Sequence, residues 1–571
     1  MTLCLASKGA RDRPSPAFSP SILPPSGDRY RFVMTRPDRQ RALLIYPRFA
    51  GTSFWNYRAT CELMGAKYSA APLGLITVAA LLPAEWEVRL VNRNTEELQE
   101  ADLLWADVVM TGGMLPQRAD VLHLIDAARG RGKPVVVGGP DTTCAPDVYA
   151  RADFRVLGEA EEVMAGFLAA WHEGAVEGVF KAKGFPDLSR SPTPRFDLLK
   201  LDQYLHVGVQ FSRGCPFDCE FCNVIELNGR TPRTKTSVQM LAELDALRTL
   251  GYRGHVDLVD DNLIGNRRAV KPFLRDLSGW LEARGQPFEF STEASLDLAD
   301  DEELLSLLRA ANFFAVFVGI ETPDRQTLLA ANKRQNANRD IARSVRAIHR
   351  AGIFVNAGFI IGFDTERRNV AQSIADCIEA ASIPVCMVGL LFALPGTRLA
   401  RRLEGEGRMA KEEARYGSED ADQCTSGINF RSLRPRHEVL RDYRDVLERI
   451  YSPEAYFRRA RRAARELDCS AHSIRPSLRN AARDVRAAFG MLWRMGVRDP
   501  RVRAEWWRSV LDCATQNPAA LKILLSFAAL YLHLGPYSRD LVDRIDADIG
   551  SATKRGKPRH RTLEERPLPR A

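Results

Sequence analysis

Residues 211–222 read Phe-Ser-Arg-Gly-Cys-Pro-Phe-Asp-Cys-Glu-Phe-Cys and place Cys215, Cys219 and Cys222 in the spacing C-x3-C-x2-C, directly after a strand-like run. Three thiolates on one tight loop are suited to three irons of a 4Fe–4S cluster, because cysteine thiolates hold such clusters. The fourth iron then lacks a protein ligand, and an open metal position separates a working site from a structural one. The spacing therefore predicts a reactive cluster.

Two other interpretations of the three cysteines stay open at this point: a zinc knuckle and three unrelated buried thiols. Zinc usually takes a fourth Cys or His nearby. The next candidate, His206, lies upstream on the predicted strand itself. The cysteine pattern favours the iron–sulfur interpretation.

The cysteine spacing and the aromatic Phe221 before the last cysteine resemble the radical S-adenosylmethionine (SAM) family. In that family SAM chelates the open iron, and an electron from the cluster cleaves SAM to start radical chemistry. The resemblance implies that Cys215, Cys219 and Cys222 bind the cluster. It also implies that Phe221 packs over the cluster or against the SAM adenine.

Length and composition set the class of protein. A chain of 571 residues predicts two to four domains, and 45% hydrophobic with 27% charged residues is typical of a soluble globular protein. The eleven cysteines are odd in number and mostly scattered, which favours a reducing cytoplasm over a disulfide framework. The composition of residues 1–40 predicts a disordered N-terminal extension without a secretory signal. Met34 is an alternative first residue of the protein.

The net charge of +9 raises the question of an anionic partner. Arginine late in the chain supplies much of the excess, and no RNA-binding motif accompanies it, so we expect no nucleic-acid partner. A solvated helix face and a basic disordered tail over residues 551–571 explain the charge. Contact with an anionic inner-membrane surface stays open.

Residues 41–180 alternate apolar strand-like runs with helical patterns, which predicts a doubly wound α/β domain. Glycines occur where strands end, and ligands of such folds bind beyond those ends. A G-x-G-x-x-G motif is absent from the sequence, so a dinucleotide is not supported.

Three stretches of this domain, 71–80, 137–140 and 152–161, resemble the cobalamin-binding domain that precedes many radical SAM domains. The D-x-H-x-x-G motif of the wider family is absent, which excludes a lower histidine ligand to cobalt. The alternative is a flavodoxin-like domain with a structural role. The resemblance implies these cobalamin-binding residues: Thr111, Gly112, Gly113, Gly138, Gly139, Pro140 and Glu159.

A polar, proline-containing linker over 181–203 precedes a second α/β region, 204–405, with six strand-like runs each followed by a helical or turn segment. Six such units match the partial (βα)6 barrel of radical SAM enzymes, with active-site residues expected at the carboxyl ends of the strands. Residues 406–550 predict a helical C-terminal domain. Its apolar run 521–532 is too short to span a bilayer and predicts a buried core helix, with an interfacial helix as the alternative.

Polar residues and glycines at these strand ends are candidates for SAM binding, as the family resemblance implies. They are Asp260, Asp261, Asn262, Glu293, Glu321, Gly358 and Gly362. One residue of 260–262 is alternatively a helix N-cap. Glu321 either contacts a ligand or pairs with an arginine, since a buried carboxylate needs a partner.

Both halves together resemble class B radical SAM enzymes, and stretches between residues 108 and 456 resemble the hopanoid C-2 methylase subgroup. This implies methylation of an unactivated carbon, with a small hydrophobic substrate and an external electron donor such as flavodoxin or ferredoxin. The implied location is the cytoplasm, with peripheral membrane contact. Alternatives are a radical SAM cyclase of tetrapyrrole synthesis, a methylase of another metabolite, and a cobalamin or iron–sulfur sensor without turnover.

Overall fold

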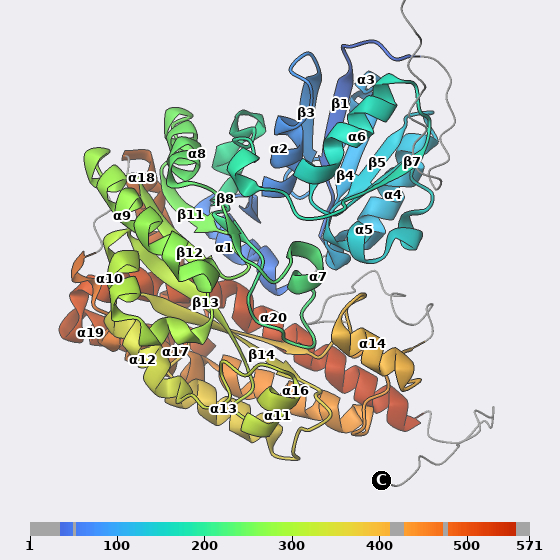
Figure 1. Cartoon of the computed structure of the whole chain (residues 1–571). Helices are drawn as coiled ribbons and strands as arrows, with labels where there is room; N and C mark the ends of the chain where they lie inside the picture. The colour runs from blue at the N-terminus through green and yellow to red at the C-terminus, as the bar shows by residue number, and fades with distance from the viewer. Residues whose placement is uncertain (1–34, 50–52, 411–426, 472–477, 555–571) are drawn as a thin grey trace, which may run out of the picture.

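The computed structural model describes residues 35–49, 53–410, 427–471 and 478–554. Figure 1 shows a blue and cyan N-terminal domain beside a green and yellow curled sheet, with the orange and red C-terminal helices packed along that sheet. The predicted disordered segments fall largely outside the described residues. Two boundaries need correction, because Arg36 stacks 3.6 Å from the Trp171 ring centre and the last helix continues to Lys554.

The N-terminal domain is a parallel six-stranded sheet in the order β3-β1-β4-β5-β6-β7. Alternate residues of β1 enter two separate cores, Ala42 and Leu44 on one face and Leu43 and Ile45 on the other. This two-sided burial confirms the predicted doubly wound fold. The strands are β1 (Arg41–Tyr46), β3 (Glu87–Asn92), β4 (Val108–Gly112), β5 (Val135–Gly138), β6 (Phe154–Leu157) and β7 (Gly178–Lys181). The helices are α2 (Leu73–Ala80), α3 (Glu100–Trp105), α4 (Arg118–Arg129), α5 (Pro140–Cys144) and α6 (Ala160–His172).

One segment inside the predicted N-terminal domain packs elsewhere. Strand β2 (Tyr68–Ala70) pairs in parallel with β8 of the second sheet. The preceding helix α1 (Arg58–Met64) contacts the C-terminal helix α20, where the Thr60 hydroxyl donates to the Ala529 carbonyl at 2.7 Å. The chain thus crosses to the second sheet and returns, a path that local sequence patterns do not reveal.

The second sheet is a curled, parallel half-barrel in the order β15-β14-β13-β12-β11-β8-β2. All six predicted strands are present, and β2 adds a seventh at one edge. In β12 the residues Phe288, Phe290 and Thr292 are buried, whereas the residues between them are half-buried. The strands are β8 (Tyr204–Val209), β11 (Gly254–Leu258), β12 (Phe288–Glu293), β13 (Phe313–Glu321), β14 (Phe354–Ile361) and β15 (Cys386–Leu390). The helices are α8 (Ser237–Thr249), α9 (Arg267–Ala283), α10 (Glu302–Ala310), α11 (Arg325–Ala330), α12 (Ile341–Arg350) and α13 (Val370–Ala380).

The C-terminal region is helical, as predicted: α14 (Arg398–Gly405), α16 (Arg436–Tyr451), α17 (Pro453–Glu466), α18 (Leu478–Met491), α19 (Pro500–Gln516) and α20 (Leu521–Lys554). Helix α20 is longer than the apolar run from which it was predicted. Residues 518–550 are long and apolar enough to cross a membrane by length and composition, but half of the most apolar window is buried in the protein. Phe527 and Leu534 are fully buried, which agrees with the core-helix prediction.

Candidate functional site

The three cysteines lie on a tight loop at the carboxyl end of β8. A short hairpin, β9 (Ser212–Arg213) with β10 (Arg233–Thr234), and helix α7 (Val224–Asn228) enclose this loop. Gly214 enters it with a φ of 98°. A Cβ atom there would lie 2.9 Å from the Asn228 carbonyl oxygen, so only glycine fits.

Two of the predicted SAM-binding carboxylates hold this loop. Asp260 is 2% exposed, and it accepts hydrogen bonds from the backbone N–H groups of Phe211 and Ser212 and from the Ser212 hydroxyl. Asp261 accepts from the Gly214 N–H at 2.8 Å. The structure therefore records loop contacts for both, and their contact with SAM stays a prediction. The N-cap alternative describes the position of Asn262, which precedes the 3-10 helix Leu263–Asn266, although its side chain makes no capping hydrogen bond there; Asn266 caps α9.

The cysteine thiols share a buried environment with one cation. Burial raises the pKa of all three thiols, that of Cys222 to about 12, and the positive charge of Lys333 acts against this rise. Burial alone would lower the pKa of Lys333, but Glu321 and Cys219 outweigh it and the net pKa is raised. The Gln335 amide lies 3.8 Å from the Cys219 sulfur. The ammonium of Lys333, which is paired with Glu321, thus acts electrostatically on all three thiols.

The zinc alternative depends on a common metal position for the three thiols. Zinc is held by Cys, His, Asp or Glu side chains around one ion. Each thiolate of an iron–sulfur cluster binds a different iron instead. Among the residues that the structure describes, no group of three such side chains surrounds a common metal position.

The two glutamates predicted at strand ends differ in their surroundings. Glu321 has a φ of 68° and forms an ion pair with Lys333, whose Nζ lies 2.6 Å from Oε1. Of the two alternatives for Glu321, contact with a ligand and pairing with an arginine, the structure shows an ion pair, and its partner is a lysine. Glu293 has a buried Oε2 atom without a hydrogen-bond partner. Burial first, and then the charges of Asp257 and Asp260, raise the Glu293 pKa well above its usual value. A cationic ligand such as SAM would favour the ionised form of Glu293 and so oppose this rise of its pKa.

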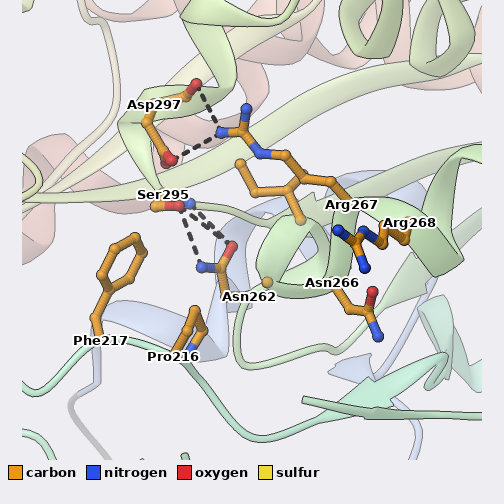
Figure 2. A pocket seen from close by; sticks show the side chains of 10 residues that line it. Pro216, Phe217, Asn262, Asn266, Arg267, Arg268, Ser295 and Asp297 are labelled. Carbon is orange, nitrogen blue, oxygen red and sulfur yellow. Dashed lines mark hydrogen bonds and ion pairs between the residues drawn. The ribbon is translucent and has the colours of Figure 1, made fainter. Parts of the chain in front are cut away.

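Asn262 lies between the cysteine loop and a pocket of about 330 Å³. Its amide nitrogen lies 3.1 Å from the Ser295 hydroxyl and 4.0 Å from the Cys215 sulfur. Figure 2 shows Asn262 and Ser295 on one wall, with Pro216 and Phe217 of the cysteine loop beside them. Of the motif 260–262, only this residue lines the pocket.

The remaining predicted residues of the half-barrel pack near the same edge. The ring of Phe221 meets that of Phe363 edge-on, with 5.9 Å between centroids. A Cβ atom on Gly358 would lie 3.1 Å from the Phe317 ring. Gly362 has a φ of 116°, and its N–H donates to Glu366 at 2.8 Å. These contacts bring both glycines close to neighbouring groups, and their approach to the SAM adenine stays a prediction.

The strand ends of the N-terminal domain face the cysteine loop. The Cys144 sulfur of α5 lies 4.0 Å from the Asn223 amide, next to Cys222. Gly138, Gly139, Gly113 and Pro140 are accessible or half-buried there, and carry no large side chain except the Pro140 ring. This bare backbone edge fits a large flat ligand held between the two domains.

Two predicted cobalamin-binding residues have other contacts in the structure. The Thr111 hydroxyl is buried and donates to the Ile45 carbonyl at 2.8 Å. Glu159 accepts from Arg213 at 2.7 Å and from Arg233 at 2.6 Å, and so joins the N-terminal domain to the cysteine hairpin. The side chains of Thr111 and Glu159 therefore bind other parts of the protein in the structure. Their contact with cobalamin stays a prediction.

Sequence reasoning missed Lys333, Gln335 and Arg213. No motif marks them. One signal was available for Lys333, because a buried carboxylate at Glu321 requires a basic partner, and Lys333 is the first lysine after it. Arg213 occurs inside the quoted cysteine stretch, but its pairing with Glu159 and Glu161 joins positions more than 50 residues apart.

Three family models match successive parts of the chain. Residues 64–168 match the B12 binding domain, and residues 209–377 match the radical SAM superfamily. Residues 397–547 match a domain of unknown function (DUF4070). A radical SAM domain uses a 4Fe–4S cluster and SAM, and a B12-binding domain binds cobalamin. The chain therefore takes these three cofactors.

Two curated relatives extend over nearly the whole chain. An uncharacterised methyltransferase of Synechocystis sp. is 43% identical over 88% of this chain and 92% of its own length. The hopanoid C-2 methylase of Rhodopseudomonas palustris is 34% identical over 82% of this chain and 88% of its own length.

Solved structures share the fold. The cobalamin-dependent SAM radical enzyme OxsB aligns over 90% of this chain and 81% of its own, with a TM-score of 0.56 and 13% identity. The radical SAM methyltransferase TsrM of Kitasatospora setae aligns over 64% of this chain and 78% of its own, with a TM-score of 0.52 and 16% identity. With two methyltransferases so similar over both domains, this chain belongs to the family of radical SAM methyltransferases that carry a B12-binding domain.

Proposed function

We propose that this enzyme methylates an unactivated carbon of a hopanoid, at C-2. The observation that carries this proposal is the 34% identity to a hopanoid C-2 methylase over 88% of that enzyme's length. A hopanoid C-3 methylase of Methylococcus capsulatus is 25% identical over 67% of its own length. The anaerobic cyclase of Rubrivivax gelatinosus matches only 40% of this chain, so the cyclase alternative has less support.

We infer the following division of work among the residues. When bound, the cluster supplies the electron for SAM cleavage and cobalamin supplies the methyl group. Cys215, Cys219 and Cys222 hold the cluster, and the ion pair of Lys333 with Glu321 lies in its surroundings. Asn262 and Glu293 offer acceptors to SAM, and the unpartnered Oε2 of Glu293 suits its ammonium group. The loop contacts of Asp260 keep the three thiols in place.

An external one-electron donor and a lipid substrate are the partners that this reaction needs. A flavodoxin or ferredoxin would suit the first role. The long apolar helix α20 is compatible with an approach to a membrane that holds the lipid, although its apolar surface is half buried. We place the enzyme in the cytoplasm, with peripheral contact to the inner membrane.

The substrate proposal is tested with purified, anaerobically reconstituted enzyme. Incubation with SAM, methylcobalamin, a strong reductant and a bacteriohopane alcohol is expected to give a product heavier by one methylene unit. With deuterium at C-2 of the substrate, the label is expected in 5′-deoxyadenosine, as measured by mass spectrometry. If deletion of the gene leaves the hopanoids of the cell unchanged, the hopanoid proposal fails, whereas methylation of another unactivated carbon stands.

Substitutions at the bare strand ends test the cobalamin site. Gly112→Val and Gly139→Val are expected to lower cobalamin affinity at least about tenfold and to leave iron content unchanged. A Cβ atom on Gly112 would lie 2.3 Å from the Gly138 carbonyl oxygen, and Gly139 has a φ of 92°. Strain of this kind costs about 1–3 kcal/mol.

Gly166→Ala in α6 is the matched control for these variants, because a Cβ atom there meets only the Phe180 ring, at 3.9 Å. Cobalamin and iron are measured together by absorbance and metal analysis. Stoichiometric cobalamin in both valine variants would contradict the assignment. Equal loss of iron and cobalamin would instead indicate damage to the whole fold.

A further inference from the structure

Inside the curled sheet lies a cluster of polar side chains that the proposed reaction does not use. The members are His206 on β8, His255 and Asp257 on β11, and Ser291 on β12. The Ser291 hydroxyl donates to Asp257 and lies 2.6 Å from Nε2 of His255. The rings of His206 and His255 are 5.0 Å apart between centroids. All four side chains are half-buried in the structure.

The order of these hydrogen bonds differs from that of a nucleophilic triad. In a Ser-His-Asp triad, the histidine lies between the acid and the serine. Here Ser291 lies between His255 and Asp257, and its hydroxyl donates to the carboxylate, so the acid binds the serine instead of orienting the imidazole. The proposed reaction removes a hydrogen atom from carbon and needs no protein base. The cluster therefore has no chemical step to perform.

Two further polar atoms on strands of this sheet are buried without a partner. They are Nδ1 of His206 on β8 and Oδ1 of Asn356 on β14. Parallel pairing aligns Asn356 with Phe317 on the adjacent strand β13. Each unpaired buried group costs about 1–3 kcal/mol, which a purely structural network would avoid. Unsatisfied acceptors of this kind suit a ligand that donates hydrogen bonds.

Aromatic rings lie beside the polar cluster, on β13 and on the 3-10 helix Phe54–Asn56. The edge of Phe314 meets the His255 ring at 5.0 Å, and Phe317 lies 5.6 Å from Trp55 between centroids. Such rings pack well against a large apolar ligand. The ligand would therefore combine an apolar body with a hydrogen-bond-donating group.

The amino end of the half-barrel is covered by α20. The Lys522 ammonium lies 2.7 Å from the Glu289 carboxylate, and Phe527 lies 4.9 Å from Phe354 between ring centroids. Burial first, and then the charges of His206 and Lys522, lower the pKa of His255 well below its usual value. The cluster presents both accepting and donating atoms, and a hydroxyl, which both donates and accepts, is the group that fits them.

We propose that His206, His255, Asp257 and Ser291 bind the hydroxyl-bearing end of an elongated apolar substrate. This rests on the proposed function only in taking the half-barrel as the place where the substrate binds. His255 is the second residue of β11, whereas the cysteine loop follows the carboxyl end of the neighbouring strand β8. The cluster would hold the hydroxyl at a distance from that loop, and it selects alcohols over hydrocarbons.

The test measures equilibrium binding of matched ligands to the full-length, cofactor-loaded enzyme in detergent. One pair is a pentacyclic triterpenoid alcohol and its deoxy hydrocarbon; the other is a steroid alcohol and its deoxy analogue. We expect the wild type to bind at least one alcohol about tenfold more tightly than its deoxy partner, and Ser291→Ala to abolish this preference without changing hydrocarbon affinity. Thr292→Val is the control, because Thr292 is buried on the opposite face and donates to the Leu258 carbonyl.

The outcomes separate this inference from the hopanoid proposal. If only the steroid pair shows a preference that Ser291→Ala removes, the hydroxyl site stands and the hopanoid substrate fails. If neither pair shows a preference, or if Thr292→Val removes it as fully as Ser291→Ala, the hydroxyl site is overturned. Methylation assays of the wild type then judge the proposed function by itself.

Discussion

Replacement of Cys215, Cys219 or Cys222 by alanine is expected to lower SAM cleavage by more than about a hundredfold. Loss of a partner one shell away from a metal typically costs about 10–100-fold, and loss of a direct ligand costs more. The three thiols also share one tight loop, so the remaining two cannot shift to replace the third. Anaerobic reconstitution followed by iron analysis and measurement of 5′-deoxyadenosine checks the result.

Cysteines elsewhere in the chain provide matched controls. Cys377 and Cys469 are half-buried free thiols on other elements, and their alanine variants are expected to keep full iron content and activity. Cys144 is a poorer control, because its sulfur lies 4.0 Å from Asn223 beside the loop. Equal loss of SAM cleavage in the loop variants and in both controls would refute the assignment of the three loop cysteines as cluster ligands.

Asp260→Ala is expected to lose the cluster rather than SAM affinity alone. The Asp260 carboxylate accepts from two backbone N–H groups and one hydroxyl at the entry to the cysteine loop. Burial raises its pKa to about 7, and these hydrogen bonds act in the opposite direction. Each unsatisfied donor costs about 1–3 kcal/mol, so the ordered loop is disfavoured by roughly a hundredfold or more.

This experiment separates the predicted role of Asp260 from the role that its contacts indicate. A SAM-binding residue would leave iron content intact and raise the dissociation constant for SAM. A loop-holding residue lowers iron content and leaves cobalamin bound in the other domain. Asp245→Ala is the control, because Asp245 pairs with Arg284 on the outer helices. Full iron content in Asp260→Ala would refute the loop-holding role.

Local sequence patterns were sufficient for most of the architecture. Continuous apolar runs such as Val135–Gly138 predicted parallel strands, because a strand covered by helices on both faces has no polar side. The six predicted strands of the half-barrel are also all present. Some of them alternate instead, as in β12, where every second residue is buried. Strand β2 escaped prediction, since three residues carry too little pattern, and its partner β8 is more than 130 residues away.

The residues of the candidate site also fall into two groups, those that a local motif marks and those whose contacts join distant segments. The spacing of Cys215, Cys219 and Cys222 is local, so the sequence by itself determined the cluster ligands that we expect. Carboxylates such as Asp260 and Glu159 were identified as important, but their partners were not, because hydrogen bonds to Ser212 and ion pairs to Arg213 depend on where distant segments meet.

The sequence alone therefore determined the class of chemistry. It shows a cysteine loop after a strand, a doubly wound domain that precedes this loop in the chain and a helical region that follows it. Only the tertiary structure decided which side chains act together. Lys333 pairs with Glu321 and acts on the thiols electrostatically, and His255, Asp257 and Ser291 meet inside the half-barrel, through contacts between separate loops and strands. Chain spacing sets local geometry, whereas packing of the curled sheet sets the distances between its strands.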